Sequence, residues 1–220
     1  MSTAAAVLAD LRAAADPAAH PNRHYGGTGE VLGVRMGTLF DIAKTHSRMP
    51  LDEVERLLDE PAYEPRLAAF CVLDFQVRRP RVTDAEREER YELYLRRHDS
   101  IDSWDMVDRS APRVVGAFLR NRSRQPLFEL AAASDPLRRR TAMTAPLAYT
   151  RPPHADGIAD LLRLAELLAA DRDPLVARPV GIALKHAGAV APDDVRDFLE
   201  RMGERLAASV RREARAKLPE

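Results

Sequence analysis

The stretch "SIDSWDMVDRSAP" holds the only Trp of the chain, Trp104, and three carboxylates at intervals of three residues, Asp102, Asp105 and Asp108. An indole contributes most to stability where a large apolar area leaves water, so a Trp among carboxylates is not typical of a protein core. Trp104 and Asp108 are four residues apart. A helix therefore places them on the same side, where an indole face and a carboxylate can contact one ligand. Asp105 is turned away from both by roughly a quarter turn.

The carboxylates of this stretch differ in their expected roles. Asp102 or Ser103 is well placed to cap the amino end of the helix, which gives Asp102 a structural use. Asp108 lies toward the carboxyl end, where Pro112 limits the helix and the helix dipole disfavours a negative charge. A buried Asp in that position needs a cationic partner or a ligand. The structural alternative is an ion pair with an arginine nearby, such as Arg109.

The composition indicates a folded protein without secreted or membrane character. The chain has 220 residues, of which 45% are hydrophobic and 31% charged, enough for one substantial core or one extended array. Its single cysteine, Cys71, excludes a disulfide within the chain and a thiolate metal cluster, and it fits a reducing cytoplasm. The amino terminus carries Asp10 and no basic region, which argues against a signal peptide, and no apolar run approaches the ~20 residues of a membrane span. We therefore expect a cytoplasmic protein.

Neither a metal nor a cofactor is expected. The six His residues show no HExxH motif and no paired-ligand spacing. The chain has no Gly-Lys-Ser/Thr phosphate loop, and the Gly-rich segment "YGGTGEVLGV" is too irregular to be one.

The charge balance does not by itself indicate a nucleic-acid partner. The chain has 34 basic and 34 acidic side chains, so its formal net charge is zero. The basic residues are almost all Arg, which binds phosphate in a bidentate manner, and they cluster in "RRPR", "RNRSR", "RRR" and "RREARAK". The alternative is that these clusters reflect codon bias and solvated helix faces.

Apolar residues recur at helical spacing in nearly every segment, and no segment alternates polar and apolar residues for long. We therefore predict an all-α chain. Similar heptapeptides place Arg66, Arg140 and Arg178 at separations of 74 and 38 residues, with Ser103 at the intervening position. This spacing predicts an α-solenoid of HEAT-like helical-hairpin repeats, in which equivalent positions line one concave face. The expected organisation is a single domain over residues 1–220, with an amino-terminal helix over 3–16 and repeats from about 35 to 217. The alternative is a chance similarity in a chain rich in Ala and Arg.

From about residue 20 to its end, the chain resembles the AlkD-type DNA alkylation-repair glycosylases, a family of HEAT-like helical arrays. The segments that carry the resemblance are "VLGVRMGTLFDIAK", "RLAAFCVLDF", "SWDMVDRSAPRVVGAFL", "LRRRTAMTAPLAY" and "RMGERLAASVRREARAKLPE". The resemblance implies a concave face that binds duplex DNA through its backbone. It also implies hydrolysis that releases cationic N-alkylated purines, such as 3-methyladenine and 7-methylguanine, without enclosing the damaged base in a pocket.

By this resemblance Asp108 is the catalytic carboxylate that stabilises positive charge on the deoxyribose and orients the attacking water. Trp104 is the aromatic wall against the sugar, and Arg140 holds a phosphate or the damaged strand. Four further residues are expected to contact DNA: Tyr25, Arg139, Arg178 and Lys185. The expected partner is double-stranded DNA with alkylated bases, bound by a monomer.

The chain also departs from the family. The family usually has a second Trp in a Gly-Trp pair, and here Ile182 follows Gly181. The amino-terminal aromatic falls at Tyr25, or by a one-residue slip at His24, and the final helix lacks a Tyr. Two functions therefore remain: a glycosylase for methylated or bulkier purine adducts, and a non-catalytic HEAT-like protein that binds DNA or a protein partner.

Overall fold

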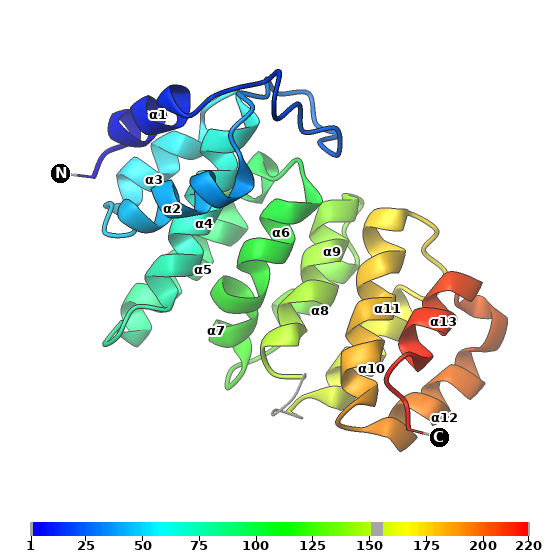
Figure 1. The fold of residues 1–220 in the computed structure, drawn as a ribbon. Helices are drawn as coiled ribbons and strands as arrows, with labels where there is room; N and C mark the ends of the chain where they lie inside the picture. Colours follow the sequence, from blue (N-terminus) through cyan, green and yellow to red (C-terminus); the bar gives the residue numbers. More distant parts are fainter. Residues whose placement is uncertain (1, 151–155, 220) are drawn as a thin grey trace. The chain divides into compact units, whose positions relative to one another are not determined.

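The computed structural model describes residues 2–150 and 156–219, and the regular secondary structure of this part of the chain is all helical, without a strand (Figure 1). The predicted all-α class is therefore confirmed, and successive helices form repeats of the α-solenoid type. The more specific HEAT-like assignment and the concave face stay predictions. No helix within the described residues has the length and apolar character needed to cross a membrane.

The chain folds into two compact units, Met1–Ser110 and Ala111–Glu220, and each is described by itself. The single domain expected over 1–220 stays a prediction. The first unit contains α1 (Ala4–Ala13), α2 (Met36–Thr45), α3 (Leu51–Leu58), α4 (Tyr63–Val77), α5 (Asp84–Arg96), a 3-10 turn η1 (His98–Ser100) and α6 (Trp104–Ala111), whose last residue begins the second unit. The second unit continues with a π-helical turn η2 (Pro112–Gly116), α7 (Ala117–Leu119), α8 (Gln125–Ala131), α9 (Pro136–Thr144), a 3-10 turn η3 (Ala145–Ala148), α10 (Ile158–Leu167), α11 (Pro174–Gly188), α12 (Pro192–Met202), a 3-10 turn η4 (Gly203–Arg205) and α13 (Ala208–Arg215).

Helix α4 forms the centre of the first unit. It packs against α2, α3 and α5, and nearly all its residues are buried, as expected of a helix that is apolar on every side. The free thiol of Cys71 is fully buried here, and burial raises its pKa to about 12. Because the reactive form is the thiolate, Cys71 is an inert core residue.

Helix α11 has the same central role in the second unit, where it packs against α9, α12 and α13 (Figure 1). Helices α9 and α11 begin in the same way. Asp135 and Asp173 each accept the backbone N–H two residues ahead, at 2.9 Å, and the next residue is a Pro whose missing N–H costs nothing at a helix start. Arg140 and Arg178 are therefore at equivalent positions along their helices, as the repeat predicts.

Two helix boundaries differ from the sequence predictions. The amino-terminal helix, expected over 3–16, runs over Ala4–Ala13 and is capped by Thr3, whose hydroxyl accepts the N–H of Ala6 at 3.2 Å. The helix that we expected Pro112 to limit continues into the π-helical turn, where the N–H of Ala117 donates to the carbonyl of Pro112. The wider turn gives the proline ring room without breaking the helical path.

Candidate functional site

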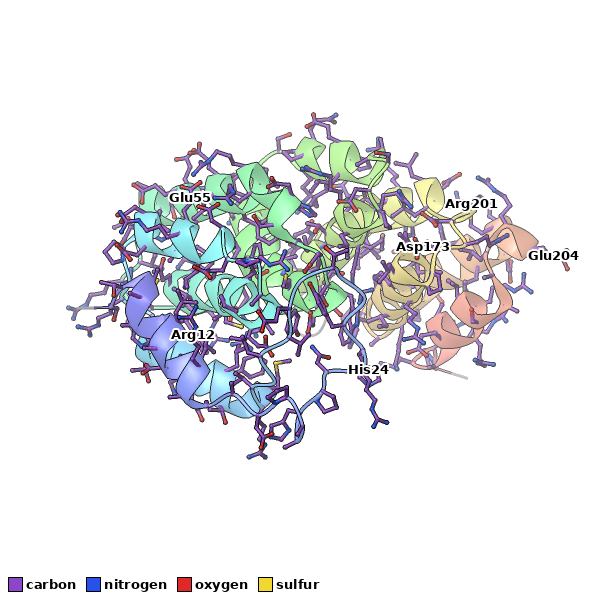
Figure 2. The ribbon with its side chains drawn as sticks, turned by 90° about the horizontal axis from the view of Figure 1, so that it is seen from above. Arg12, His24, Glu55, Asp173, Arg201 and Glu204 are labelled. Atoms are coloured by element: carbon purple, nitrogen blue, oxygen red, sulfur yellow. The ribbon has the colours of Figure 1, made fainter. Side chains whose placement is uncertain are left out.

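A pocket of about 310 Å³ lies entirely within the first unit, beside Trp104. The segment before α2 forms one wall, and α2, α4 and α6 form the others. Its lining residues are Asn22, His24, Tyr25, Met36, Phe40, Leu67, Ser103, Trp104, Asp105 and Arg109. Figure 2 labels His24 on the segment that leads into α2. The pocket is largely apolar and aromatic, with a few polar groups, as small-molecule sites usually are.

Trp104 is the first residue of α6 and has 41% of its surface exposed. The prediction that it is not a core Trp is therefore confirmed. Asp108 lies four residues further along the same helix and is half-buried. It is not among the residues that line the pocket, whereas Asp105 is.

Asp102 is held by a tyrosine and an arginine. It accepts a hydrogen bond from the hydroxyl of Tyr25, and Nη2 of Arg66 donates to the same oxygen at 2.7 Å. Arg66 also donates to the Tyr25 oxygen at 3.0 Å. Burial and the neighbouring Asp102 raise the pKa of Tyr25, so the phenol stays neutral and acts as a donor to the carboxylate. These contacts take the place of the helix cap that the sequence predicts for Asp102, and they fix the segment around Tyr25 to the start of α6.

Within the part of the chain that the structure describes, the hydrogen-bond donors to Asp105 are all neutral. One oxygen accepts the hydroxyl of Tyr63, and the other accepts the hydroxyl of Ser103 at 2.6 Å and the N–H of Met106 at 3.0 Å. Tyr63 is buried, and burial together with the Asp105 charge raises the pKa of its phenol well above the ordinary value. Its ring lies 4.6 Å from that of Tyr25, so the two tyrosines bind adjacent carboxylates from one aromatic cluster.

Arg109 lines the pocket from the last turn of α6. Its guanidinium lies over the rings of Phe40, at 4.6 Å, and Phe75, at 4.9 Å. It pairs with Asp74 at 3.0 Å, and this carboxylate is fully buried. Arg78 pairs with the same carboxylate at 3.5 Å, so Arg109 is one of two counter-ions of this core carboxylate.

The arginines expected to contact DNA differ in their surroundings within the second unit. Arg140 is 5% exposed and donates to the carbonyl of Leu175 at 2.8 Å. Arg139 pairs with Asp171 at 2.7 Å and also bonds two carbonyls ahead of its own helix. Both side chains tie α9 to the start of α11.

Arg178 and Ile182 line a second pocket, of about 560 Å³, between α11 and α13. Arg178 is exposed, and Ile182 is half-buried. Lys185, one turn further, donates to Glu213 of α13 at 2.8 Å, and this contact lowers the pKa of the Glu213 carboxyl. The structure thus joins Trp104 with Tyr25 in one pocket and Arg178 with Ile182 in another, each within its own unit.

A family model described as "DNA alkylation repair enzyme" matches residues 7–218, nearly the whole chain. The chain belongs to the DNA alkylation repair enzyme family. Among solved structures it is similar to one described as a predicted DNA alkylation repair enzyme from Enterococcus faecalis. The TM-score is 0.67 and the identity 15%, over 87% of this chain and 90% of that one. This likeness shows a shared fold. A search of curated proteins finds no match.

The pocket of this DNA alkylation repair family member includes residues that the sequence analysis did not select. Met36 and Phe40 are four apart on α2, and they reach the pocket only because α2 packs against α4. The sequence pointed to these two residues only indirectly, because both lie in the segment "VLGVRMGTLFDIAK", which contributes to the family resemblance. Within residues 2–150 and 156–219, no three His, Cys, Asp or Glu side chains are grouped so as to hold a metal ion.

Proposed function

We propose that this DNA alkylation repair family member is a glycosylase that hydrolyses the N-glycosidic bond of cationic N-alkylated purines in duplex DNA. The observation that carries the proposal is the half-exposed Trp104 with the Asp108 carboxylate four residues further along the same helix. A half-exposed indole leaves apolar ring surface available to a ligand, and its π face attracts positive charge. A carboxylate one turn away favours a ligand that becomes cationic.

The reaction needs little acid catalysis, because alkylation at a ring nitrogen already makes the base a good leaving group. The bond between C1′ and the purine nitrogen breaks, its electron pair moves into the ring, and the released base is neutral. Positive charge then develops on the deoxyribose, where the carboxylate of Asp108 stabilises it. Water adds to C1′, and its proton leaves through Asp108 to solvent. The step needs neither a metal nor another cofactor.

The remaining residues have supporting roles in this proposal. Trp104 lies against the deoxyribose, and Arg140 holds a phosphate or the damaged strand. The expected backbone contacts are those of Tyr25, Arg139, Arg178 and Lys185. We propose that the protein acts on DNA as a cytoplasmic monomer.

A second candidate function is a DNA-binding protein without glycosylase activity. Ile182 favours it, because the side chain that lines the second pocket is aliphatic where the family usually has a Trp. Bulkier purine adducts would also suit a site widened in this way.

The test is base release from duplex DNA carrying 7-methylguanine under single-turnover conditions, comparing the wild type with Asp108→Asn. We expect release by the wild type and a loss of about 100-fold or more in the variant, because a carboxylate that stabilises transition-state charge contributes several kcal/mol. The matched control is Asp41→Asn, which removes an exposed carboxylate from α2 that lines neither of the two pockets described above.

Equal rates for the wild type and Asp108→Asn would contradict the catalytic role. No release by either protein, with duplex binding that weakens steeply with salt, would support the non-catalytic candidate.

A further inference from the structure

Leu167 is the most exposed of the large apolar side chains that the structure describes, with 62% of its surface in solvent. The other exposed members of this class, Met36 and Trp104, line the pocket of the first unit. Leu167 is the last residue of α10 in the second unit and has no part in the proposed function. A single exposed leucine is ordinary, but one that lines a surface pocket with other apolar and charged groups is typical of a binding surface.

Leu167 lines a pocket of about 430 Å³ between α8 and α10, which we call the Leu167 pocket. Its lining residues are Phe128, Arg163, Glu166, Leu167 and Arg205. Helices α8 and α10 pack against each other in the second unit, and the last of these residues comes from η4 (Figure 1). The Leu167 pocket shares no lining residue with the pocket between α11 and α13, so it is separate from the residues expected to contact DNA.

The helical period of α10 explains why Leu167 lies in solvent. The buried face of this helix consists of Ile158, Leu161, Leu164 and Ala165. Arg163 and Leu167 are four residues apart and therefore lie together on the opposite side. Because α10 packs through the other face, Leu167 can be replaced without opening a cavity in the core.

Arg163 and Phe128 form one wall of the pocket. The guanidinium of Arg163 lies over the Phe128 ring, 4.8 Å from its centre. Arg163 pairs with Asp160 at 3.7 Å, and Asp160 is held more closely by Arg124, at 2.9 Å. Two arginines therefore share one carboxylate, which leaves positive charge beside the apolar surface.

The charges on the rest of the pocket are also unequal. Glu166 is the one carboxylate among the described lining residues, and Arg201, labelled in Figure 2, lies 4.0 Å from it. The side chain of Arg205 has no carboxylate within ion-pair distance in residues 2–150 and 156–219. Glu129 and Glu204 adjoin lining residues in the sequence, but both are exposed and neither lines the pocket. The pocket therefore combines an apolar centre with an excess of arginine at its edge.

We propose that the Leu167 pocket binds a short acidic segment of a partner protein. A large apolar side chain of the segment lies between Phe128 and Leu167, and flanking carboxylates pair with Arg163 and Arg205. Aromatic and arginine side chains are enriched among the residues that dominate binding at protein interfaces. The volume is near the lower end of the range for ligand pockets, roughly 300–1,000 Å³, and suits an anchoring side chain better than a whole helix. This inference goes beyond the proposed function and does not rest on it.

An acidic segment fits the pocket better than duplex DNA does. A duplex offers phosphates to the arginines, but its outer surface has no large apolar group to cover Leu167 and Phe128. A peptide can carry both an apolar anchor and carboxylates within a few residues. Complementary charge at the edge of such a site gives specificity and a faster encounter.

The first experiment selects short random peptides on the protein and counter-selects them on the double variant Leu167→Ser, Arg205→Glu. Both positions are exposed, so the double variant is expected to fold, and its thermal unfolding should match that of the wild type. We expect the retained peptides to combine a large apolar residue with several Asp or Glu. No enrichment over the double variant, or enrichment without an excess of acidic residues, would overturn the proposal.

Fluorescence anisotropy of the most enriched peptide, carrying a dye, then measures each contribution. Leu167→Ser and Arg205→Glu are each expected to weaken binding at least about tenfold, because an anchor contact or a charge partner is lost. Arg215→Glu is the matched control, since it reverses an exposed charge of the same unit that lines neither the Leu167 pocket nor the pocket between α11 and α13. Equal affinity of the wild type and Leu167→Ser, or an equal loss in Arg215→Glu, would overturn the site.

Two other occupants would give different results. A second copy of the chain would give a dimer in sedimentation that Leu167→Ser converts to a monomer. Duplex DNA would give duplex binding that Leu167→Ser and Arg205→Glu weaken and Arg215→Glu does not. Either result would overturn the acidic segment as the occupant. Base release plays no part in these measurements, so this proposal and the glycosylase fail separately.

Discussion

At the scale of single residues, two buried tyrosines differ in one respect, whether the hydroxyl has a partner. Tyr63 is 2% exposed and donates to Asp105, while Tyr149 is 1% exposed and its hydroxyl has no hydrogen-bond partner among the described residues. We expect Tyr63→Phe to lower the free energy of unfolding by about 1–2 kcal/mol, because a carboxylate loses a donor. Tyr149→Phe should change it by less than about 0.5 kcal/mol or raise it. Urea unfolding of both variants measures the contrast, and equal losses would contradict it.

Tyr149 also predicts a loss of stability at alkaline pH. Burial raises the pKa of its phenol from 10.0 to about 12. Between these values the unfolded chain has lost the proton and the folded chain still holds it, so the free energy of unfolding falls as pH rises. We expect the wild type to lose about 1 kcal/mol per pH unit relative to Tyr149→Phe from pH 10 upward, and nothing below it. Parallel stability curves for the two proteins over this range would contradict the assignment.

The same scale shows what the sequence could predict of the site. The exposed Trp104 followed from its polar neighbours, and the four-residue spacing to Asp108 followed from helix geometry. The sequence could not show that Asp105, and not Asp108, lines the pocket with Trp104. That pocket depends on Tyr25 and on α2, and no local pattern predicts which distant side chains will meet.

At the scale of elements, two helical glycines differ in whether a Cβ atom would fit at their position. Gly116 has ordinary helical angles, but a Cβ there would overlap the carbonyl oxygen of Ala145 and approach the Cβ of Ala148 at 3.1 Å, where η2 and η3 pack together. Gly37 lies on α2, and a Cβ there would meet nothing within 4 Å.

We expect Gly116→Ala to cost about 1–3 kcal/mol of unfolding free energy, because the opposing backbone cannot move aside cheaply. Gly37→Ala should be stabilising by up to about 1 kcal/mol, since it only removes freedom from the unfolded chain. Thermal unfolding of both variants checks the difference, and a destabilised Gly37→Ala would show that helix α2 is packed more closely than the structure indicates.

Helices were predictable where apolar residues follow the helical period, which is why the all-α class is confirmed. Their boundaries were less predictable, because alternatives of similar energy compete there. Pro112 illustrates this, since a π-helical turn accommodates it and a break does not occur. The capped starts of α9 and α11 did carry a local signal, an Asp followed by a Pro, and both begin where that pair lies.

At the scale of the whole molecule, the repeat gives equivalent positions without equivalent surroundings. Arg140 and Arg178 each follow their helix start by the same number of residues, yet Arg140 is buried against Leu175 and Arg178 is exposed. Arg66, the first member, binds Asp102 and Tyr25. The shared register holds for α9 and α11 only, because Arg66 is the fourth residue of α4 and Ser103 precedes the first residue of α6. The common row that we expected for these residues stays a prediction.

At the same scale, the net charge of zero does not show which basic side chains can contact DNA, because many arginines are paired with acidic residues. Arg178 has no carboxylate within ion-pair distance among the described residues, whereas Lys185 is bound to Glu213 at 2.8 Å.

If the protein binds duplex DNA through its backbone, the logarithm of the binding constant falls with the logarithm of the salt concentration, with a slope of about 0.9 for each phosphate contact. We therefore expect Arg178→Gln to reduce this slope by about one and Lys185→Gln by less, because breaking the Glu213 pair offsets part of the gain. Arg56→Gln, at a paired and exposed position on α3, is the control, and its slope should equal that of the wild type. A slope unchanged by Arg178→Gln would remove this residue from the DNA interface. The absence of any salt dependence in the wild type would argue against a nucleic-acid partner altogether, since phosphate contacts cannot form without releasing counterions.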